Sequence, residues 1–200
     1  MHLLRFLDIF PLQLSRLAPI LSLREESMAQ ELRIITTGGT FDKQYDAISG
    51  DLTFRESQLP RILGQARCTL TVHLEGPLAV DSLYMTEEQR REIANSCLHS
   101  PEDRIVVIHG TDTMCNTATT IANTLGAEHT KTIVLTGAMI PYSLEGSDAV
   151  FNLGCAITAV QLLQPGVYLT MSGRIFSWDN CRKNKEKGIF EPIDPSQKAY

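Results

Sequence analysis

The sequence predicts an α/β fold: a doubly wound, mostly parallel sheet with helices on both faces, as in a Rossmann-like three-layer sandwich. Short apolar runs that fit buried strands alternate with longer stretches of helical periodicity. Two hydroxyl-rich turns, Thr36–Thr40 and His109–Thr113, each follow such a run directly. A chain of 200 residues that is 43% hydrophobic and 20% charged is also long enough to bury a core.

The first expected strand is Leu32–Ile35, and a looser stretch from Asp42 to Pro60 follows it. Because long loops in compact domains are often lids, we interpret this stretch as a long loop that can act as one. Thr69–Leu74 is the second expected strand. Thr86–Gln89 matches a capping box, so a helix should begin there and bury a stripe formed by Ile93, Cys97 and Leu98.

Ile105–Ile108 is short and wholly β-branched, which predicts a central strand. Right-handed crossovers should connect it to its parallel neighbours. The remaining elements are expected in this order: a helix Thr113–Leu125 with Gly126 as its C-cap, a strand Thr132–Leu135, a loop Gly137–Gly146, a helix Asp148–Leu163 capped by Ser147 and stopped by Pro165-Gly166, and a strand Val167–Thr170.

Residues 1–27 differ from the rest of the chain. They are rich in leucine but are interrupted by charged residues and a proline, so they match neither a transmembrane span nor a secretory signal. We expect them to be an N-terminal extension outside the domain, with Met28 as the physiological start. A short amphipathic targeting helix is the alternative. Residues 28–200 would then form a single domain.

Charge and cysteine usage exclude several classes of partner and site. The net charge of −5, from 18 basic and 23 acidic residues, opposes nonspecific binding to nucleic acid or to anionic membranes. Five cysteines without a CxxC pair do not suggest structural disulfides or a zinc site, which favours a reducing, cytoplasmic compartment. Neither common phosphate-binding glycine loop is present. We therefore expect no metal, no cofactor, no nucleic acid and no membrane partner.

The two hydroxyl-rich turns predict a ligand site built on threonine oxygens. In parallel α/β proteins, ligands bind at the carboxyl edge of the strands, where both turns should lie. Thr40 offers its hydroxyl beside Gly38 and Gly39, which let a substrate approach the backbone closely. A threonine hydroxyl is a weak nucleophile, so it needs a neighbouring group to activate it.

Several segments between about Leu32 and Asn184 resemble the bacterial-type L-asparaginase family. Thr37-Gly38-Gly39-Thr40 resembles the first family signature, whose last threonine is the nucleophile, and His109–Met114 resembles the second. Asp81–Thr86 is similar to the serine-bearing segment that holds the substrate's carboxylate. Lys183 falls where the family's catalytic lysine would be. Further similarities are Gly137-Ala138-Met139, Pro141, Asp148 and Phe151-Asn152-Leu153.

The resemblance implies an amidohydrolase that converts L-asparagine to L-aspartate and ammonia through a threonine acyl-enzyme. It assigns the catalytic roles to Thr40, Thr111, Asp112 and Lys183, with Tyr45 as the candidate to deprotonate or orient Thr40. Which threonine attacks first stays open. The substrate-binding residues would be Ser82, which with nearby backbone amides suits the α-carboxylate, Asp81 of the same segment, Thr111, Asp112 at the α-ammonium, and the Ala138 carbonyl at the departing amide.

The chain also departs from the family pattern. Family members usually carry a second, C-terminal domain that helps bind the substrate's α-amino group in a neighbouring subunit, whereas this chain ends at Tyr200. It therefore resembles a short, single-domain member in which the C-terminal domain is absent. Tyr45 is closer to Thr40 than the family's lid tyrosine is. Ile140 replaces a common arginine, and Cys115-Asn116 replaces a usually acidic pair.

Alternatives remain open for the function and for each residue. The chain could hydrolyse another small amide, such as glutamine or a modified asparagine, or could be a non-catalytic module that binds an amino acid. His109 is expected to be structural. The other residues have these structural roles as alternatives: Thr40 and Asp112 as helix caps, Ser82 as a loop serine, Tyr45 in packing, and Lys183 on a solvated surface.

The expected helix Asp148–Leu163 has almost no polar face. A helix that is apolar all round needs cover on every side, and one small domain does not readily supply it. We therefore expect a homodimer, or a higher homo-oligomer.

Overall fold

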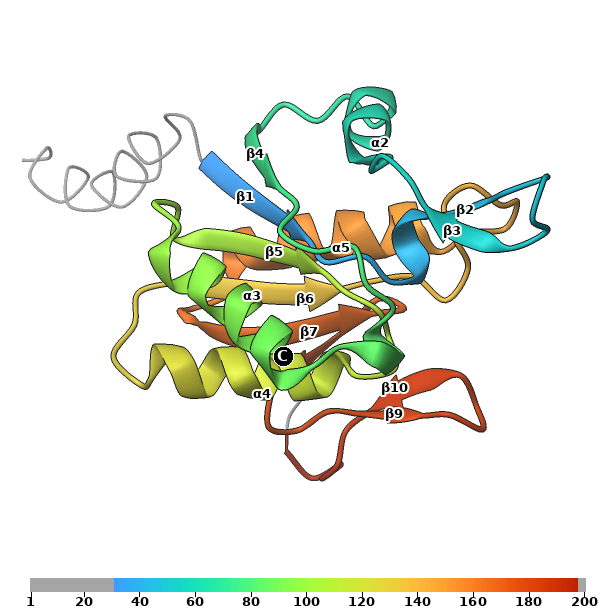
Figure 1. The fold of residues 1–200 in the computed structure, drawn as a ribbon. Helices are drawn as coiled ribbons and strands as arrows, with labels where there is room; N and C mark the ends of the chain where they lie inside the picture. Colours follow the sequence, from blue (N-terminus) through green and yellow to red (C-terminus); the bar gives the residue numbers. More distant parts are fainter. Residues whose placement is uncertain (1–30, 198–200) are drawn as a thin grey trace, which may run out of the picture. The chain divides into compact units, whose positions relative to one another are not determined.

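The computed structural model describes residues 31–197, so the expected extension, residues 1–27, and the expected start at Met28 lie outside the described residues. At the centre of residues 31–197 lies a six-stranded sheet of order β4-β1-β5-β6-β7-β8 (Figure 1). All neighbours are parallel except the last pair. The strands are β1 (Glu31–Thr36), β4 (Thr71–Glu75), β5 (Arg104–Ile108), β6 (Thr132–Thr136), β7 (Gly166–Met171) and β8 (Arg174–Ser177).

Helices cover both faces of this sheet, which confirms the predicted three-layer α/β fold. α3 (Glu87–His99) and α4 (Met114–Leu125) pack on one face, and α2 (Leu59–Gln65) and α5 (Ala149–Leu162) on the other (Figure 1). Successive β5 residues alternate between the two cores, because side chains of a strand point to opposite faces. No helix among residues 31–197 combines the length and apolar character that a membrane span needs.

Capping residues in the sequence predicted most helix ends correctly. The capping box is present: the Thr86 hydroxyl accepts from the Gln89 amide at 3.3 Å, and the Gln89 side chain accepts from the Thr86 amide at 2.9 Å. Gly126 ends α4 with a φ of 73°. Asp148, rather than the expected Ser147, occupies the N-cap position of α5, although the Ser147 hydroxyl accepts from the first amide of this helix at 3.1 Å. Leu98, expected in the buried stripe of α3, is instead 39% exposed.

The long loop interpretation of residues 42–60 is wrong in part. This stretch contains a hairpin of β2 (Lys43–Tyr45) and β3 (Leu52–Phe54), and it runs into α2, whose Leu59 is fully buried. Pro60 lies in the first turn of that helix, where its missing N–H costs nothing. A second hairpin that periodicity did not predict follows the sheet: β9 (Arg182–Asn184) with β10 (Ile189–Glu191).

The crossover through α5 is left-handed, so the prediction that all crossovers are right-handed is wrong there. The connections β5–α4–β6 and β6–α5–β7 step in the same direction across the sheet, but their helices lie on opposite faces (Figure 1). Such a pair must have opposite hands. In Figure 1 the strands point to the right, β6 lies below β5 and α4 lies in front, so the connection through α4 is the right-handed one. The long connection at residues 137–148 lets the chain pass to the other face. The Asp148 carboxylate then fixes it by accepting from the Met139 and Ile140 amides, each at 3.0 Å.

The strand order creates a crevice between β1 and β5. The chain leaves β1 for β4 on one side and leaves β5 for β6 on the other. In doubly wound sheets, connections that diverge in this way open a ligand crevice at the carboxyl ends of the two strands. The turns Thr36–Thr40 and His109–Thr113 follow these two ends, so both lie at the crevice.

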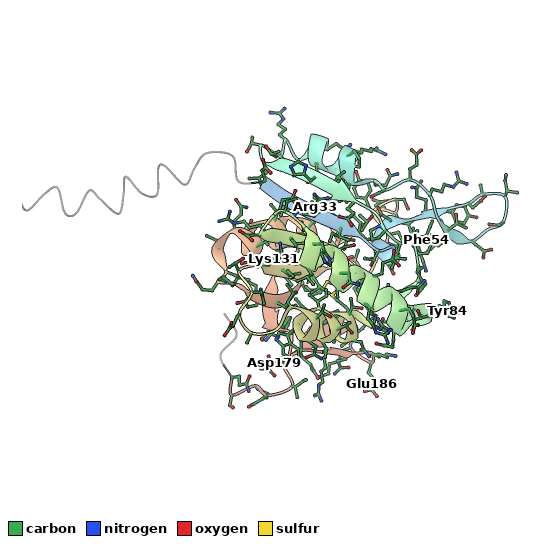
Figure 2. The ribbon with its side chains drawn as sticks, turned by 60° about the vertical axis from the view of Figure 1, so that its left-hand side comes forward. Arg33, Phe54, Tyr84, Lys131, Asp179 and Glu186 are labelled. Carbon is green, nitrogen blue, oxygen red and sulfur yellow. The ribbon has the colours of Figure 1, made fainter. Side chains whose placement is uncertain are left out.

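An ion pair near the amino ends of β1 and β5, away from the crevice, makes the stability of the fold depend on pH. Hydrogen bonds from the guanidinium of Arg33, which is labelled in Figure 2, at 2.8 and 2.9 Å lower the pKa of the buried Glu102 to about 2, with help from Ser100. Because the folded pKa lies below the unfolded one, this stabilisation is present above about pH 4.5 and is lost as the pH falls toward 2.

We expect Glu102→Gln to lower the free energy of unfolding by about 2 kcal/mol at pH 7 and to flatten its decline between pH 5 and 2. Urea denaturation across this pH range measures both effects. Glu186→Gln, at an exposed position, is the matched control. Identical pH profiles for wild type and Glu102→Gln would contradict the assignment.

Candidate active site

The two hydroxyl-rich turns touch each other through glycines. A Cβ at Gly39 would lie 2.4 Å from the amide nitrogen of Gly110, a distance that no side chain allows. Gly39 also has a φ of 75°, a conformation that side chains disfavour. The Thr37 amide donates to the Ile108 carbonyl at 3.0 Å and continues the pairing of β1 with β5. Thr40 and Thr111, the next residue of each turn, therefore lie on adjoining backbones.

A third segment, residues 79–82, packs against both turns. The Val80 amide donates to the Thr37 carbonyl, and the Gly39 amide donates to the Val80 carbonyl, each at 3.1 Å. A Cβ at Gly110 would lie 2.5 Å from the Ser82 hydroxyl, so Ser82 lies directly over the second turn. Ser82 is 1% exposed, and within residues 31–197 its hydroxyl has no hydrogen-bond partner. A buried hydroxyl left without a partner can bind a ligand.

Lys183 joins the second turn from the β9–β10 hairpin. Its ammonium nitrogen, Nζ, donates to the Thr111 hydroxyl at 2.7 Å and to the Asp112 carboxylate at 2.8 Å. The Lys183 side chain is only 12% exposed, whereas Lys185 and Lys187 nearby are exposed. The structure thus brings together Thr111, Asp112 and Lys183. Two of the three N–H bonds of an ammonium are used in these contacts, so one remains for a ligand.

Thr40 and Asp112 do not act as helix caps in this structure. Thr40 is the first residue of the short 3-10 helix η1 (Thr40–Asp42), and no side chain caps that helix. Thr113, rather than Asp112, occupies the N-cap position of α4. The carboxylate of Asp112 is directed to Lys183 instead.

Asp81 has a partner that the sequence did not reveal. Lys43 forms an ion pair with it at 2.6 Å, and the Leu83 amide donates to its other oxygen at 3.0 Å. Burial raises the pKa of the Asp81 carboxyl, but the hydrogen bonds from Lys43 and Leu83 outweigh this and hold the pKa below its usual value. Asp81 therefore fixes the segment of Ser82 to the start of the β2–β3 hairpin.

Tyr45 is not brought to the other predicted residues. It ends β2 and is 58% exposed, and its hydroxyl has no hydrogen-bond partner within the described residues. Ala138, by contrast, is buried at the carboxyl end of β6. A Cβ at the preceding Gly137 would lie 2.3 Å from the His109 carbonyl, so this turn also packs against the second signature.

His109 is held as a structural residue, as expected. Its Nδ1 donates to the Gly110 carbonyl and its Nε2 accepts from the Thr117 hydroxyl, both at 2.8 Å. Complete burial lowers the pKa of His109 to about 4, so the ring stays neutral near pH 7. With both nitrogens occupied, the ring is not free to act as a base.

The described residues contain one group whose donors would suit a cation, and it lies elsewhere. The ligand atoms of Glu31, His73 and Glu102 are within 4.8 Å of one another, near the amino ends of β1 and β5. Arg33 already binds both oxygens of Glu102. This group is therefore separate from the crevice that holds Thr111 and Lys183.

Comparison with known proteins identifies the family. The family model described as asparaginase, N-terminal, matches residues 31–190. The chain belongs to the asparaginase family. That match includes both turns, the Ser82 segment and Lys183, which confirms the resemblance seen in the sequence.

The relatives within the family include an amidotransferase subunit as well as an L-asparaginase. A subunit of the glutamyl-tRNA(Gln) amidotransferase of Methanococcus vannielii is 30% identical over 179 residues, which are 84% of this chain and 40% of that protein. L-asparaginase 1 of Escherichia coli strain K12 is 31% identical over 134 residues, which are 62% of this chain and 38% of that protein. The chain thus spans about two fifths of the length of these curated relatives.

A solved relative has the same fold. The thermostable L-asparaginase from Thermococcus kodakarensis matches 82% of this chain with a TM-score of 0.73 and 25% sequence identity. The alignment covers 51% of the solved chain. The mostly parallel sheet with helices on both faces is therefore the fold of this family.

Proposed function

We propose that this chain hydrolyses the side-chain amide of L-asparagine to L-aspartate and ammonia through a threonine acyl-enzyme. The observation that carries the proposal is the contact of the Lys183 amine with the Thr111 hydroxyl and the Asp112 carboxylate beside the turn of Thr40. In its neutral form, with the hydroxyl then donating to it, an amine at this distance can take the proton of the hydroxyl and make it a nucleophile. No cofactor takes part in this chemistry.

In the proposed reaction, Thr40 is the first candidate nucleophile and Thr111 the second. The attacking oxygen bonds to the amide carbon, the C–N bond breaks, and ammonia leaves with the proton that the threonine gave up. Water then cleaves the ester and restores the hydroxyl. Asp112 holds Lys183 in place, and Tyr45 would orient Thr40 only if the β2–β3 hairpin moves on substrate binding, because its side chain is exposed.

The charged ends of the substrate need partners of their own. We assign its α-carboxylate to the Ser82 hydroxyl, which is buried and has no partner in residues 31–197. Asp81 supports that segment through Lys43. The α-ammonium is assigned to Asp112, which has one oxygen on Lys183. The carbonyl of Ala138 would accept from the departing amide.

A second candidate is the hydrolysis of another small amide, such as glutamine. The similarity to the amidotransferase of Methanococcus vannielii favours it, since that relative matches more of this chain than L-asparaginase 1 does. A non-catalytic module that binds an amino acid is the third possibility. The Lys183 contacts argue against it, because binding alone does not need an amine on a buried threonine hydroxyl.

Ammonia release from L-asparagine and from L-glutamine by the full chain tests these alternatives. We expect faster release from asparagine, and none from either amide with Lys183→Met. Preference for glutamine would favour the second candidate. A folded protein that binds asparagine but releases no ammonia would overturn the proposal and favour the binding module.

We also propose that residues 28–200 form one domain of the asparaginase N-terminal type, and that the protein acts in the cytoplasm. The five cysteines all lie within the described residues and are free thiols, as a reducing compartment favours.

The homodimer expected from the sequence stays a prediction, and α5 offers a surface for it. Val150, Phe151 and Leu162 are exposed along this helix. We expect light scattering over a dilution series to give a dimer mass, and Leu162→Lys to weaken the association. Gln161→Lys, at the preceding and already polar position, is the matched control. A monomer mass at micromolar protein with full activity would contradict the prediction.

A further inference from the structure

Two cysteine thiols meet beside the candidate active site. Cys115 lies in the first turn of α4, three residues after Asp112, and Cys181 lies two residues before Lys183. The thiol of Cys181 donates a hydrogen bond to the sulfur of Cys115. Both line a cleft of about 620 Å³ with Trp178 and Asp179, on the segment that leads to β9. Asp179 is labelled in Figure 2. Cys115 is half-buried, so a small reagent can reach it from this cleft, whereas Cys181 is buried behind it.

The surroundings favour ionisation of Cys115. The hydrogen bond from Cys181 lowers the pKa of Cys115, and the backbone amides of Cys115 and Lys183 also donate to its sulfur, so that together they outweigh burial. The start of a helix further favours a thiolate. The pKa of Cys181 is raised by its hydrogen bond to Cys115 and by burial. One thiolate with a neighbouring thiol is the arrangement that reacts with oxidants.

The mechanism proposed above uses neither thiol, and another buried cysteine shows the contrast. Cys97 is fully buried in α3, and burial raises the pKa of its thiol to about 12. Such a thiol is inert near neutral pH. Cys155 is half-buried on α5, across the sheet from the pair, and serves as a control position.

We propose that Cys115 and Cys181 form a reversible disulfide that switches the site off under hydrogen peroxide. The Cys115 thiolate attacks one peroxide oxygen, the O–O bond breaks, and hydroxide leaves and is protonated to water. The sulfur of Cys181 then attacks the resulting sulfenic acid, the S–OH bond breaks, and a second water leaves with the Cys181 proton. Two thiols and one peroxide thus give one disulfide and two waters, and the two sulfurs lose two electrons.

The effect on the site follows from the position of Lys183, and this step rests on the proposed function. A disulfide brings the two sulfurs to about 2 Å, which is closer than a hydrogen bond allows. Cys181 must then move toward α4, and Lys183, two residues further along the chain, is displaced with it. A shift of about 1 Å in a catalytic group can cost about 100-fold in rate. We expect a loss of about that size on oxidation.

The test treats the full chain with hydrogen peroxide and follows chemistry and activity separately. Mass spectrometry should show a loss of about 2 Da, and peptide mapping should join Cys115 to Cys181. Ammonia release should fall about 100-fold and return with dithiothreitol. Cys155→Ala should respond as wild type does. Cys115→Ala and Cys181→Ala should keep their activity under the same peroxide treatment.

The outcomes separate the failure of this switch from the failure of the proposed function. A chain that releases no ammonia before oxidation refutes the function, while mass and mapping still decide whether the disulfide forms. Oxidation of Cys115 to sulfinic acid without a link to Cys181 overturns the switch. So does a mapped Cys115–Cys181 disulfide in a chain whose rate is unchanged. These readouts on wild type hold even if a cysteine variant fails to fold.

Discussion

Thr111→Val is expected to lower the rate of amide hydrolysis by about 1,000-fold or more while the protein stays folded. The Thr111 hydroxyl accepts from Lys183 at 2.7 Å, and valine keeps the shape of the side chain but removes this acceptor. Lys183 would then be held by Asp112 alone and would have no hydroxyl to deprotonate. The lost hydrogen bond should cost only about 1 kcal/mol of stability. Steady-state kinetics and thermal unfolding measure the two effects.

Thr119→Val is the matched control for this experiment. Thr119 is a half-buried threonine of α4 whose hydroxyl donates within the helix to the Cys115 carbonyl at 3.0 Å. Its loss should leave the rate close to that of wild type. More than about a tenth of the wild-type rate in Thr111→Val would refute the relay, because removal of a group that activates a nucleophile costs far more than tenfold.

Thr40→Ala is expected to have an effect as large as that of Thr111→Val, because it removes the first candidate nucleophile. Thr40→Ser keeps a hydroxyl and should keep measurable turnover. A covalent adduct trapped on Thr40 or on Thr111, found by mass spectrometry of the denatured protein, would show which threonine attacks first. An active Thr40→Ala protein would transfer the role of nucleophile to Thr111.

The sheet could be predicted because its signals are local. A β-branched run such as Ile105–Ile108 has to be a buried strand in almost any context, and the capping box at Thr86 starts a helix by itself. The two turns followed from the same strands. Their meeting at one crevice follows from the rule for doubly wound sheets and needs no side-chain detail.

The two hairpins and the contacts of the site could not be predicted, because they depend on parts of the chain that are distant in the sequence. The hairpins β2–β3 and β9–β10 have strands of three residues, too short to carry a periodic pattern. Lys183 lies on one of them, so only its place in the family pattern suggested a role, while its neighbours Lys185 and Lys187 do face solvent. Cys115 and Cys181 meet only because that hairpin returns to α4.

Gly39→Ala is expected to destabilise the fold by at least about 3 kcal/mol, or to prevent folding. Gly39 combines a φ of 75° with a ψ of −177°, which only glycine adopts readily. A Cβ there would also lie 2.4 and 2.5 Å from the amide nitrogen and Cα of Gly110. These are backbone atoms of a turn that follows a central strand, so they cannot move aside as a flexible side chain can.

Gly154→Ala separates this effect from a general cost of replacing glycine. Gly154 lies inside α5, and a Cβ there meets nothing within 4 Å, so alanine should raise the free energy of unfolding by about 0.5–1 kcal/mol. Urea denaturation of both variants gives the comparison. Any Gly39→Ala protein that still folds must hold the two turns apart, and it should therefore lose turnover as well. Full activity at near wild-type stability would mean that Thr40 and Thr111 do not need the contact between Gly39 and Gly110.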